Sequence, residues 1–155
     1  MPSRRDLLGH SARLATLLAA AALLPELARA QASSYNGVAF DAKTIADVMK
    51  ALGASAPVES KEVTITAPDI AENGAVVPVS ASTALAGVRR ILILVEKNPA
   101  VLSAMFNVTD AIEPNFSTRL KMDQSSNVYA VAMMGDGKVL FAQKDVRVTL
   151  GGCVG

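Results

Sequence analysis

The sequence predicts an all-β domain, an antiparallel sandwich of short strands with a short helix before them. Between residues 62 and 150, short apolar or alternating runs are separated by turn-forming residues. This spacing of strands and turns is typical of a β-sandwich. The immunoglobulin-like class fits this pattern best, although its usual disulfide and tryptophan are absent, because the chain has one Cys and no Trp.

A helix is predicted just before the strands. Apolar residues recur there at the spacing of one helix face: Ile45, Val48, Met49 and Leu52. We expect Asp41 to cap the helix at its N-terminus and Gly53 to end it.

The first predicted strands have period-two or continuous apolar patterns. A turn at residues 72–74 (Glu-Asn-Gly) separates the first from the second, and Pro78 indicates a sheet edge or a bulge in the second. The four strands predicted in this part of the chain are residues 62–67, 76–81, 90–96 and 101–108.

The last third of the chain has the clearest pattern. Residues 117–122 alternate, and residues 128–134 are apolar on both faces, which predicts a central strand. Gly135-Asp136-Gly137 then turns the chain into a hairpin with residues 138–142. A final alternation at residues 146–150 ends at a pair of glycines.

The N-terminus has the features of an export signal. Arg4 and Arg5 form a twin-arginine motif, an Ala- and Leu-rich run follows at residues 14–24, and Ala28-Arg29-Ala30 offers a cleavage site. The run is too short to span a membrane. A helix of the folded domain is the alternative, but the order of the three regions favours a signal. We therefore expect residues 1–30 to be a twin-arginine signal peptide, with export to the periplasm and a mature N-terminus at Gln31.

Removing the signal narrows the possible chemistry. The signal takes four of the 15 basic and two of the 14 acidic residues, which leaves 11 and 12 and a net charge of −1. That balance offers no basic surface for nucleic acid. The only histidine, His10, also leaves, so Ser-His-Asp catalysis, Cys-His catalysis and histidine-based metal or haem sites are excluded.

The last five residues, Gly151-Gly152-Cys153-Val154-Gly155, hold the only cysteine. A cysteine without a partner in an exported protein is a reactive thiol or forms an intermolecular bond. The flanking glycines give its backbone unusual freedom. Extended, the chain from Leu150 to Cys153 reaches roughly 10 Å. These residues predict a short arm that carries a nucleophilic thiol.

The chain resembles the SoxY family, the sulfur-carrier subunits of the thiosulfate-oxidising Sox system. The resemblance covers the signal, the helix, a β-domain with the segment VTITAPDIAENGAVVPVSAST, and the terminal Gly-Gly-Cys. It implies an immunoglobulin-like domain at residues 31–150 and a carrier arm at 151–155. It also implies that Cys153 holds the sulfur covalently, without catalytic residues, a metal or another cofactor.

The same resemblance implies partners. A SoxZ-like subunit is expected to form a heterodimer with the chain, through an apolar face or by strand addition. Three enzymes are expected to dock transiently: a haem enzyme that joins thiosulfate to the thiol, a hydrolase that releases sulfate, and a sulfur dehydrogenase. The carrier performs none of these reactions, and no nucleic acid or membrane partner is expected after export.

The arm departs from the family pattern at one position. The usual ending is Gly-Gly-Cys-Gly-Gly, whereas Val154 follows Cys153 here. A β-branched residue stiffens and widens the tip, which narrows the choice of partner enzymes. No neighbour in sequence lowers the pKa of the thiol, so activation is expected from the partner's site. The alternative function is an exported interaction protein whose terminal cysteine forms an intermolecular disulfide.

Overall fold

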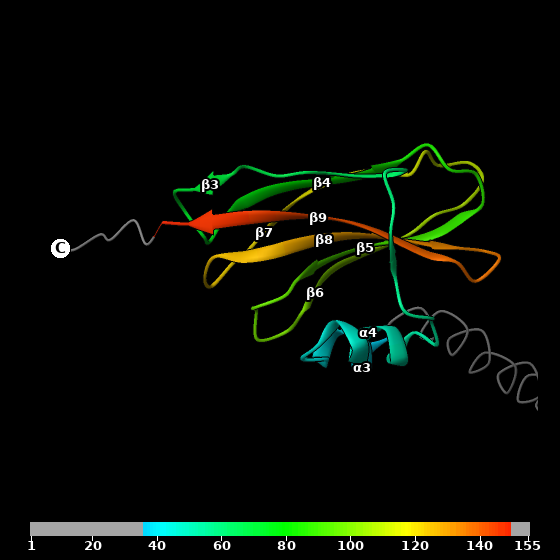
Figure 1. Cartoon of the computed structure of the whole chain (residues 1–155), viewed down its shortest axis with the longest axis horizontal. Coiled ribbons are helices and arrows are strands. Elements are labelled where there is room, and N and C mark those ends of the chain that lie inside the picture. Colours follow the sequence, from blue (N-terminus) through cyan, green and yellow to red (C-terminus); the bar gives the residue numbers. More distant parts are fainter. Residues whose placement is uncertain (1–35, 150–155) are drawn as a thin grey trace, which may run out of the picture. The chain divides into compact units, whose positions relative to one another are not determined.

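A computed structural model of the chain describes residues 36–149 (Figure 1). These residues form two short helices and nine strands. No helix among them is long and apolar enough to cross a membrane. The elements are α3 (Gly37–Asp41), α4 (Ile45–Ala51), β1 (Val58–Glu59), β2 (Val63–Thr66), β3 (Ile70–Ala71), β4 (Val77–Thr83), β5 (Val88–Val95), β6 (Leu102–Asn107), β7 (Asn115–Leu120), β8 (Ser126–Met134) and β9 (Val139–Val148).

The strands form two sheets. The larger has the order β1-β9-β8-β5-β6, and β3 pairs with β9 beyond β1; the smaller has the order β2-β4-β7. The pairings between long strands are antiparallel, whereas β1 and β3 each run parallel to β9. The prediction of a β-sandwich with a short N-terminal helix is confirmed, and the two short parallel strands are additions to it.

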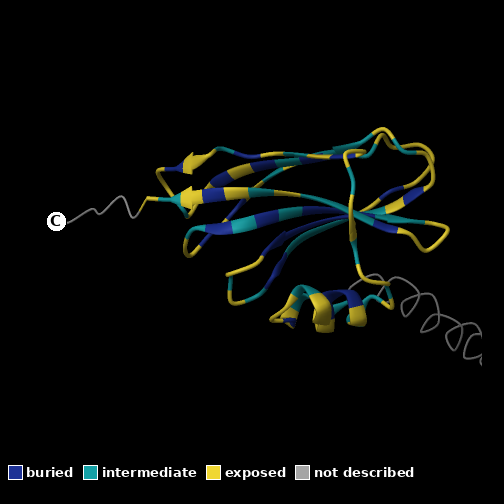
Figure 2. Cartoon of the chain, viewed as in Figure 1, coloured by how far each residue is buried: buried dark blue, intermediate teal, exposed yellow. Residues whose placement is uncertain are grey.

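The core lies between the two sheets, and a second cluster lies under the helices. Along β5, Ile91 and Ile93 belong to the core between the sheets, while Leu92 and Leu94 belong to the cluster with α3 and α4. All four are fully buried, and burial of one such side chain contributes roughly 1.5–3 kcal/mol. Figure 2 shows the buried residues along β5 and β8. Because both faces of β5 and β8 are covered, apolar residues predominate from residue 91 to 95 and from 128 to 134.

The helix is confirmed, but its predicted cap is wrong. Thr44 is the N-cap of α4, and its hydroxyl accepts a hydrogen bond from the backbone N–H of Asp47 at 3.1 Å. Asp41 is instead the last residue of α3, which the sequence did not predict because five residues are too few to show a helical period. Gly53 ends the helix as expected, with a φ of 65°.

The predicted long strands are all present, with two refinements. Pro78 lies in β4, the middle strand of the small sheet, but β2 pairs only with residues 80–83 of β4. Pro78 therefore has a neighbouring strand on one side only, where it pairs with Arg119. The two predicted segments at 138–142 and 146–150 are one strand, β9, after the hairpin turn in which Gly137 has a φ of 92°.

Candidate functional site: the root of the C-terminal arm

The described chain ends next to the predicted arm. Gly151, Gly152, Cys153, Val154 and Gly155 lie outside the described residues, and so do Arg4 and Arg5 of the signal motif. The structure instead describes residues 147–149, the segment from which the arm departs, which we call the arm root. In Figure 1 this segment is the tip of β9, which leads to the C-terminal end.

One side of the arm root is held by β3. The backbone N–H of Arg147 donates to the carbonyl of Asp69 at 3.0 Å, and that of Thr149 donates to the carbonyl of Ala71 at 3.0 Å. The Thr149 hydroxyl also donates a hydrogen bond to the Ala71 carbonyl at 3.4 Å. The two residues of β3 run parallel to β9 and pair with it at Arg147 and Val148.

The other side is held by a side chain. The pairing of β8 with β9 ends at Ser126 and Val146. Beyond it, the Ser125 hydroxyl accepts a hydrogen bond from the Val148 N–H at 2.8 Å and lies 3.4 Å from the Val148 carbonyl, as a donor. Ser125 thus takes the place of a backbone partner and bonds to β9 two residues beyond the last position that pairs with β8.

A glycine makes room for the arm root. A Cβ added to Gly74 would lie 2.5 Å from the Met122 carbonyl oxygen and 2.8 Å from Cγ1 of Val148. The Gly74 carbonyl also accepts a hydrogen bond from the Met122 N–H at 2.7 Å. The predicted turn at residues 72–74 therefore has a long-range role: it packs against the segment from which the arm leaves.

The neighbouring loops are tied to each other. The Asn98 amide donates to the Lys121 carbonyl at 2.7 Å, and its oxygen accepts from the Asp123 N–H at 3.2 Å. The next residue after Ser125, Ser126, accepts a hydrogen bond from the Lys97 N–H at 3.0 Å. The β5–β6 turn therefore supports the loop that contains Ser125.

The two basic residues of β9 nearest the arm both have acidic neighbours. Lys144 Nζ lies 3.0 Å from Asp69 Oδ1, and Arg147 Nε lies 4.0 Å from Asp145 Oδ2. The Arg147–Asp145 pair is exposed, and in the other pair Asp69 is exposed while Lys144 is half-buried, so each pair contributes little to stability. Their charges are nevertheless balanced locally.

One tyrosine has a shifted pKa, away from the arm root. Burial, and then the nearby Glu96 carboxylate, raise the pKa of Tyr129 above its usual value of 10.0. Its hydroxyl stays protonated at neutral pH and donates to Glu96 Oε2 at 3.4 Å. Its ring packs against Phe141, with the centroids 5.7 Å apart. This group stabilises the large sheet, and we assign it no chemistry.

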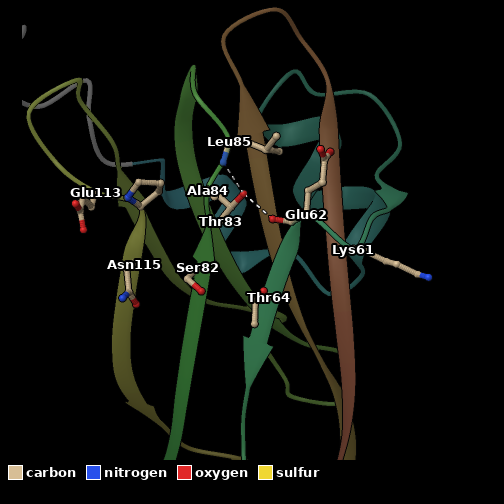
Figure 3. Close-up of a pocket in the computed structure, with 10 residues that line it drawn as sticks. Lys61, Glu62, Thr64, Ser82, Thr83, Ala84, Leu85, Glu113 and Asn115 are labelled. Atoms are coloured by element: carbon tan, nitrogen blue, oxygen red, sulfur yellow. Dashed lines mark hydrogen bonds between the residues drawn. The ribbon is translucent and has the colours of Figure 1, made fainter.

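An open hollow lies at the far end of β4 from Gly74 (Figure 3). It is an open groove of about 850 Å³ beside the small sheet. Thr83 occupies its centre: its hydroxyl donates to the Glu62 carbonyl at 2.7 Å and accepts from the Leu85 N–H at 3.2 Å. In Figure 3, Lys61 points away from the other lining residues. Residues 36–149 contain no cluster of three His, Cys, Asp or Glu that could hold a metal.

The predicted functional residues themselves lie outside the described residues, so only the segment before them is described. Residue patterns identified the end of the last strand and the turn at 72–74, but not Ser125 or the pairing of β3 with β9. A single serine in a loop carries no local signal for a partner 23 positions away. A strand of two residues is likewise too short for a period to show.

Comparisons with known proteins match this fold and its C-terminal end. The family model for sulfur oxidation protein SoxY matches residues 48–153. The solved structure of the sulfur carrier protein SoxY from Chlorobium limicola f thiosulfatophilum is 36% identical, with a TM-score of 0.62, over 69% of this chain and 97% of that chain. No curated protein sequence matches.

A second group of solved structures shares the fold alone. Superoxide reductase (neelaredoxin) from Ignicoccus hospitalis is 21% identical, with a TM-score of 0.50, over 56% of this chain and 80% of that chain. A variant of the same protein with one substitution is also 21% identical, with a TM-score of 0.51, over 64% of this chain and 87% of that chain.

Proposed function

This chain belongs to the SoxY family, and on that premise we propose that it carries sulfur intermediates covalently on Cys153 in the periplasm. The family match, which extends to residue 153, is the observation that carries the proposal. The solved relative is described as a sulfur carrier protein. Carriage requires a thiol that can reach into another protein while its attachment to the carrier stays fixed.

The arm root supplies the fixed attachment. Hydrogen bonds hold the chain on the β3 side as far as Thr149 and on the Ser125 side as far as Val148. From there, an extended chain to Cys153 spans roughly 13–14 Å. That length is sufficient for a thiol to enter a channel of a docked enzyme while the β-domain stays outside.

The chemistry of carriage needs only a thiolate on this chain. In the first step, the Cys153 thiolate and the outer sulfur of thiosulfate form a sulfur–sulfur bond, and two electrons leave to a haem enzyme. A hydrolase then adds water across the bond to the sulfonate group, releasing sulfate and two protons and leaving a persulfide. A sulfur dehydrogenase oxidises the outer persulfide sulfur to a sulfonate, taking up three waters and passing on the electrons. A second hydrolysis frees the thiolate.

The residues of this chain indicate which steps its partner enzymes must catalyse. The proposed mature chain has no histidine, so it offers no imidazole base for these steps, and the enzymes supply the catalytic groups. The carrier is their shared substrate. The proposal includes the other expectations from the sequence: the signal at residues 1–30 with Arg4 and Arg5, the domain at 31–150, the arm at 151–155, and a heterodimer with a SoxZ-like subunit.

The arm residues have distinct proposed roles. Gly151 and Gly152 let the backbone bend between the root and the thiol. Val154 widens the tip beyond Cys153 and, with Gly155, must fit the channel of each enzyme. We propose that this valine restricts which partner enzymes accept the carrier.

The test is the intact mass of protein purified from the native periplasm during growth on thiosulfate, with and without a reductant. Adducts of sulfur or thiosulfonate that the reductant removes, and that a Cys153→Ser variant lacks, are expected. A bare thiol, or only disulfides to other proteins, would contradict carriage and favour the interaction protein instead. A mass that begins at Gln31 would also verify the cleavage site.

A further inference from the structure

Within residues 36–149, one edge of the sandwich lacks the usual protection. Exposed edge strands usually carry charges, prolines or short lengths that prevent pairing with other chains. Strand β6 (Leu102–Asn107, LSAMFN) has six residues and neither a charge nor a proline. A register shift in its pairing with β5 lies near Leu94, but from Ala104 to Asn107 the register is regular.

The other described edges are protected. On the outer side of β9, β1 pairs with Leu140 and Phe141 and β3 pairs with Arg147 and Val148, and the stretch between them carries the charges of Lys144 and Asp145. At the edges of the small sheet, β2 has four residues and is followed by Pro68 within two positions, while β7 begins directly after Pro114 and contains Arg119. Among the described edge strands, β6 is therefore the one with no feature that prevents pairing with another chain.

The outward backbone groups of β6 can be identified. The Val108 N–H donates to the Arg89 carbonyl, and the register pairs Phe106 with Ile91 and Ala104 with Ile93. In an antiparallel pair, hydrogen-bonded and non-hydrogen-bonded positions alternate. The N–H and C=O groups of Met105 and Asn107 therefore point away from β5, along the open edge.

An aromatic pair lies beside this edge. Phe106 of β6 and Phe116 of β7 stack with centroids 4.5 Å apart and ring planes 6° apart, and they link the two sheets on their open side. Both rings are half-buried and pack against the core. A strand added to β6 would cover part of this aromatic surface as well as pair with the backbone.

We propose that β6 is the docking edge for the SoxZ-like subunit, which adds one of its own strands to the large sheet. This inference rests on the proposed function for the existence of that subunit. The edge requires an extended segment, because only a strand matches alternate outward donors and acceptors. The uncharged edge and the aromatic pair call for a partner strand with apolar side chains on the face toward Phe106 and Phe116.

The first test uses the heterodimer and amide hydrogen exchange by NMR. Binding of the SoxZ-like subunit should slow exchange of the Met105 and Asn107 amides at least tenfold. The Ala104 and Phe106 amides already point to β5 and should change much less. Equal slowing at all four, or none at Met105 and Asn107, would overturn strand addition.

Variants test the same edge by affinity. Met105→Pro removes an outward N–H that the domain itself does not use, and Asn107→Glu adds a charge opposite Arg90, which the fold tolerates. Each should weaken the heterodimer at least tenfold, as measured by analytical ultracentrifugation. Thr64→Glu, on the exposed face of β2, is the matched control and should leave it unchanged.

The outcomes separate this inference from the carrier role. Unchanged heterodimer affinity in folded Asn107→Glu protein would overturn the docking edge while leaving sulfur adducts on Cys153 untouched. Loss of a self-associated form, with no effect on the SoxZ-like subunit, would assign the edge to a second copy and also overturn the proposal. Should Met105→Pro fail to fold, Asn107→Glu and the exchange pattern decide.

Discussion

The centre of the large sheet and the root of the arm are held in different ways. In the centre, β5 and β8 are buried on both faces by apolar side chains from neighbouring elements. At the arm root, β9 is held by the Ser125 hydroxyl on one side and two residues of β3 on the other. Hydrophobic burial makes the domain stable, whereas a few polar contacts hold the end of β9.

The largest expected effect is at the centre. Ile93→Ala removes a fully buried side chain between the sheets and should lower the free energy of unfolding by about 2–5 kcal/mol in urea denaturation. Thr64→Ala, on an exposed face, should change it by less than about 0.5 kcal/mol. Similar losses in both variants would contradict the assignment of the core.

A smaller effect is expected where the arm root packs on Gly74. Gly74→Ala places a Cβ against the Met122 carbonyl and the Val148 side chain. It should lower the free energy of unfolding by about 1–3 kcal/mol. Gly135→Ala is the matched control, because the nearest atom to its Cβ, at 3.2 Å, belongs to the Arg89 side chain. If thermal unfolding showed Gly74→Ala to be as stable as the wild type, the close contact would be refuted.

The smallest effect on stability is expected from Ser125→Ala, about 1 kcal/mol. Its effect on the arm root should be clear, because the Val148 N–H loses its hydrogen-bond acceptor and should exchange with solvent faster. Ser80→Ala removes a comparable hydroxyl, paired with Ser117 at 2.7 Å on the small sheet, and should leave the Val148 amide unchanged. An unchanged Val148 amide in Ser125→Ala would show that the serine does not define the end of β9.

The same contrast explains what could be predicted from sequence. Strands β5 and β8 were found because burial leaves a local apolar pattern, and the hairpin before β9 because turns need particular residues. The cap of α4 was misplaced because Asp41 and Thr44 can both cap a helix, and only the position of α3 decides between them. The hydrogen bonds between β3 and the arm root could not be predicted, because Ala71 and Thr149 are far apart in sequence.

The candidate site also has one part that the sequence predicts and one part that only the structure describes. The composition and the terminal Gly-Gly-Cys predict Cys153 as the reactive position without any structure. The contacts that hold its attachment come from three separate segments, around Asp69, Gly74 and Ser125. None has a sequence pattern that indicates a function.

The central claim is that sulfur travels on Cys153. Its most direct test is the mass of the C-terminal peptide that contains this residue, from cells grown with and without thiosulfate and digested without reductant. Sulfur-bearing forms of this peptide are expected only in cells grown with thiosulfate. The same unmodified or protein-linked peptide under both conditions would contradict it.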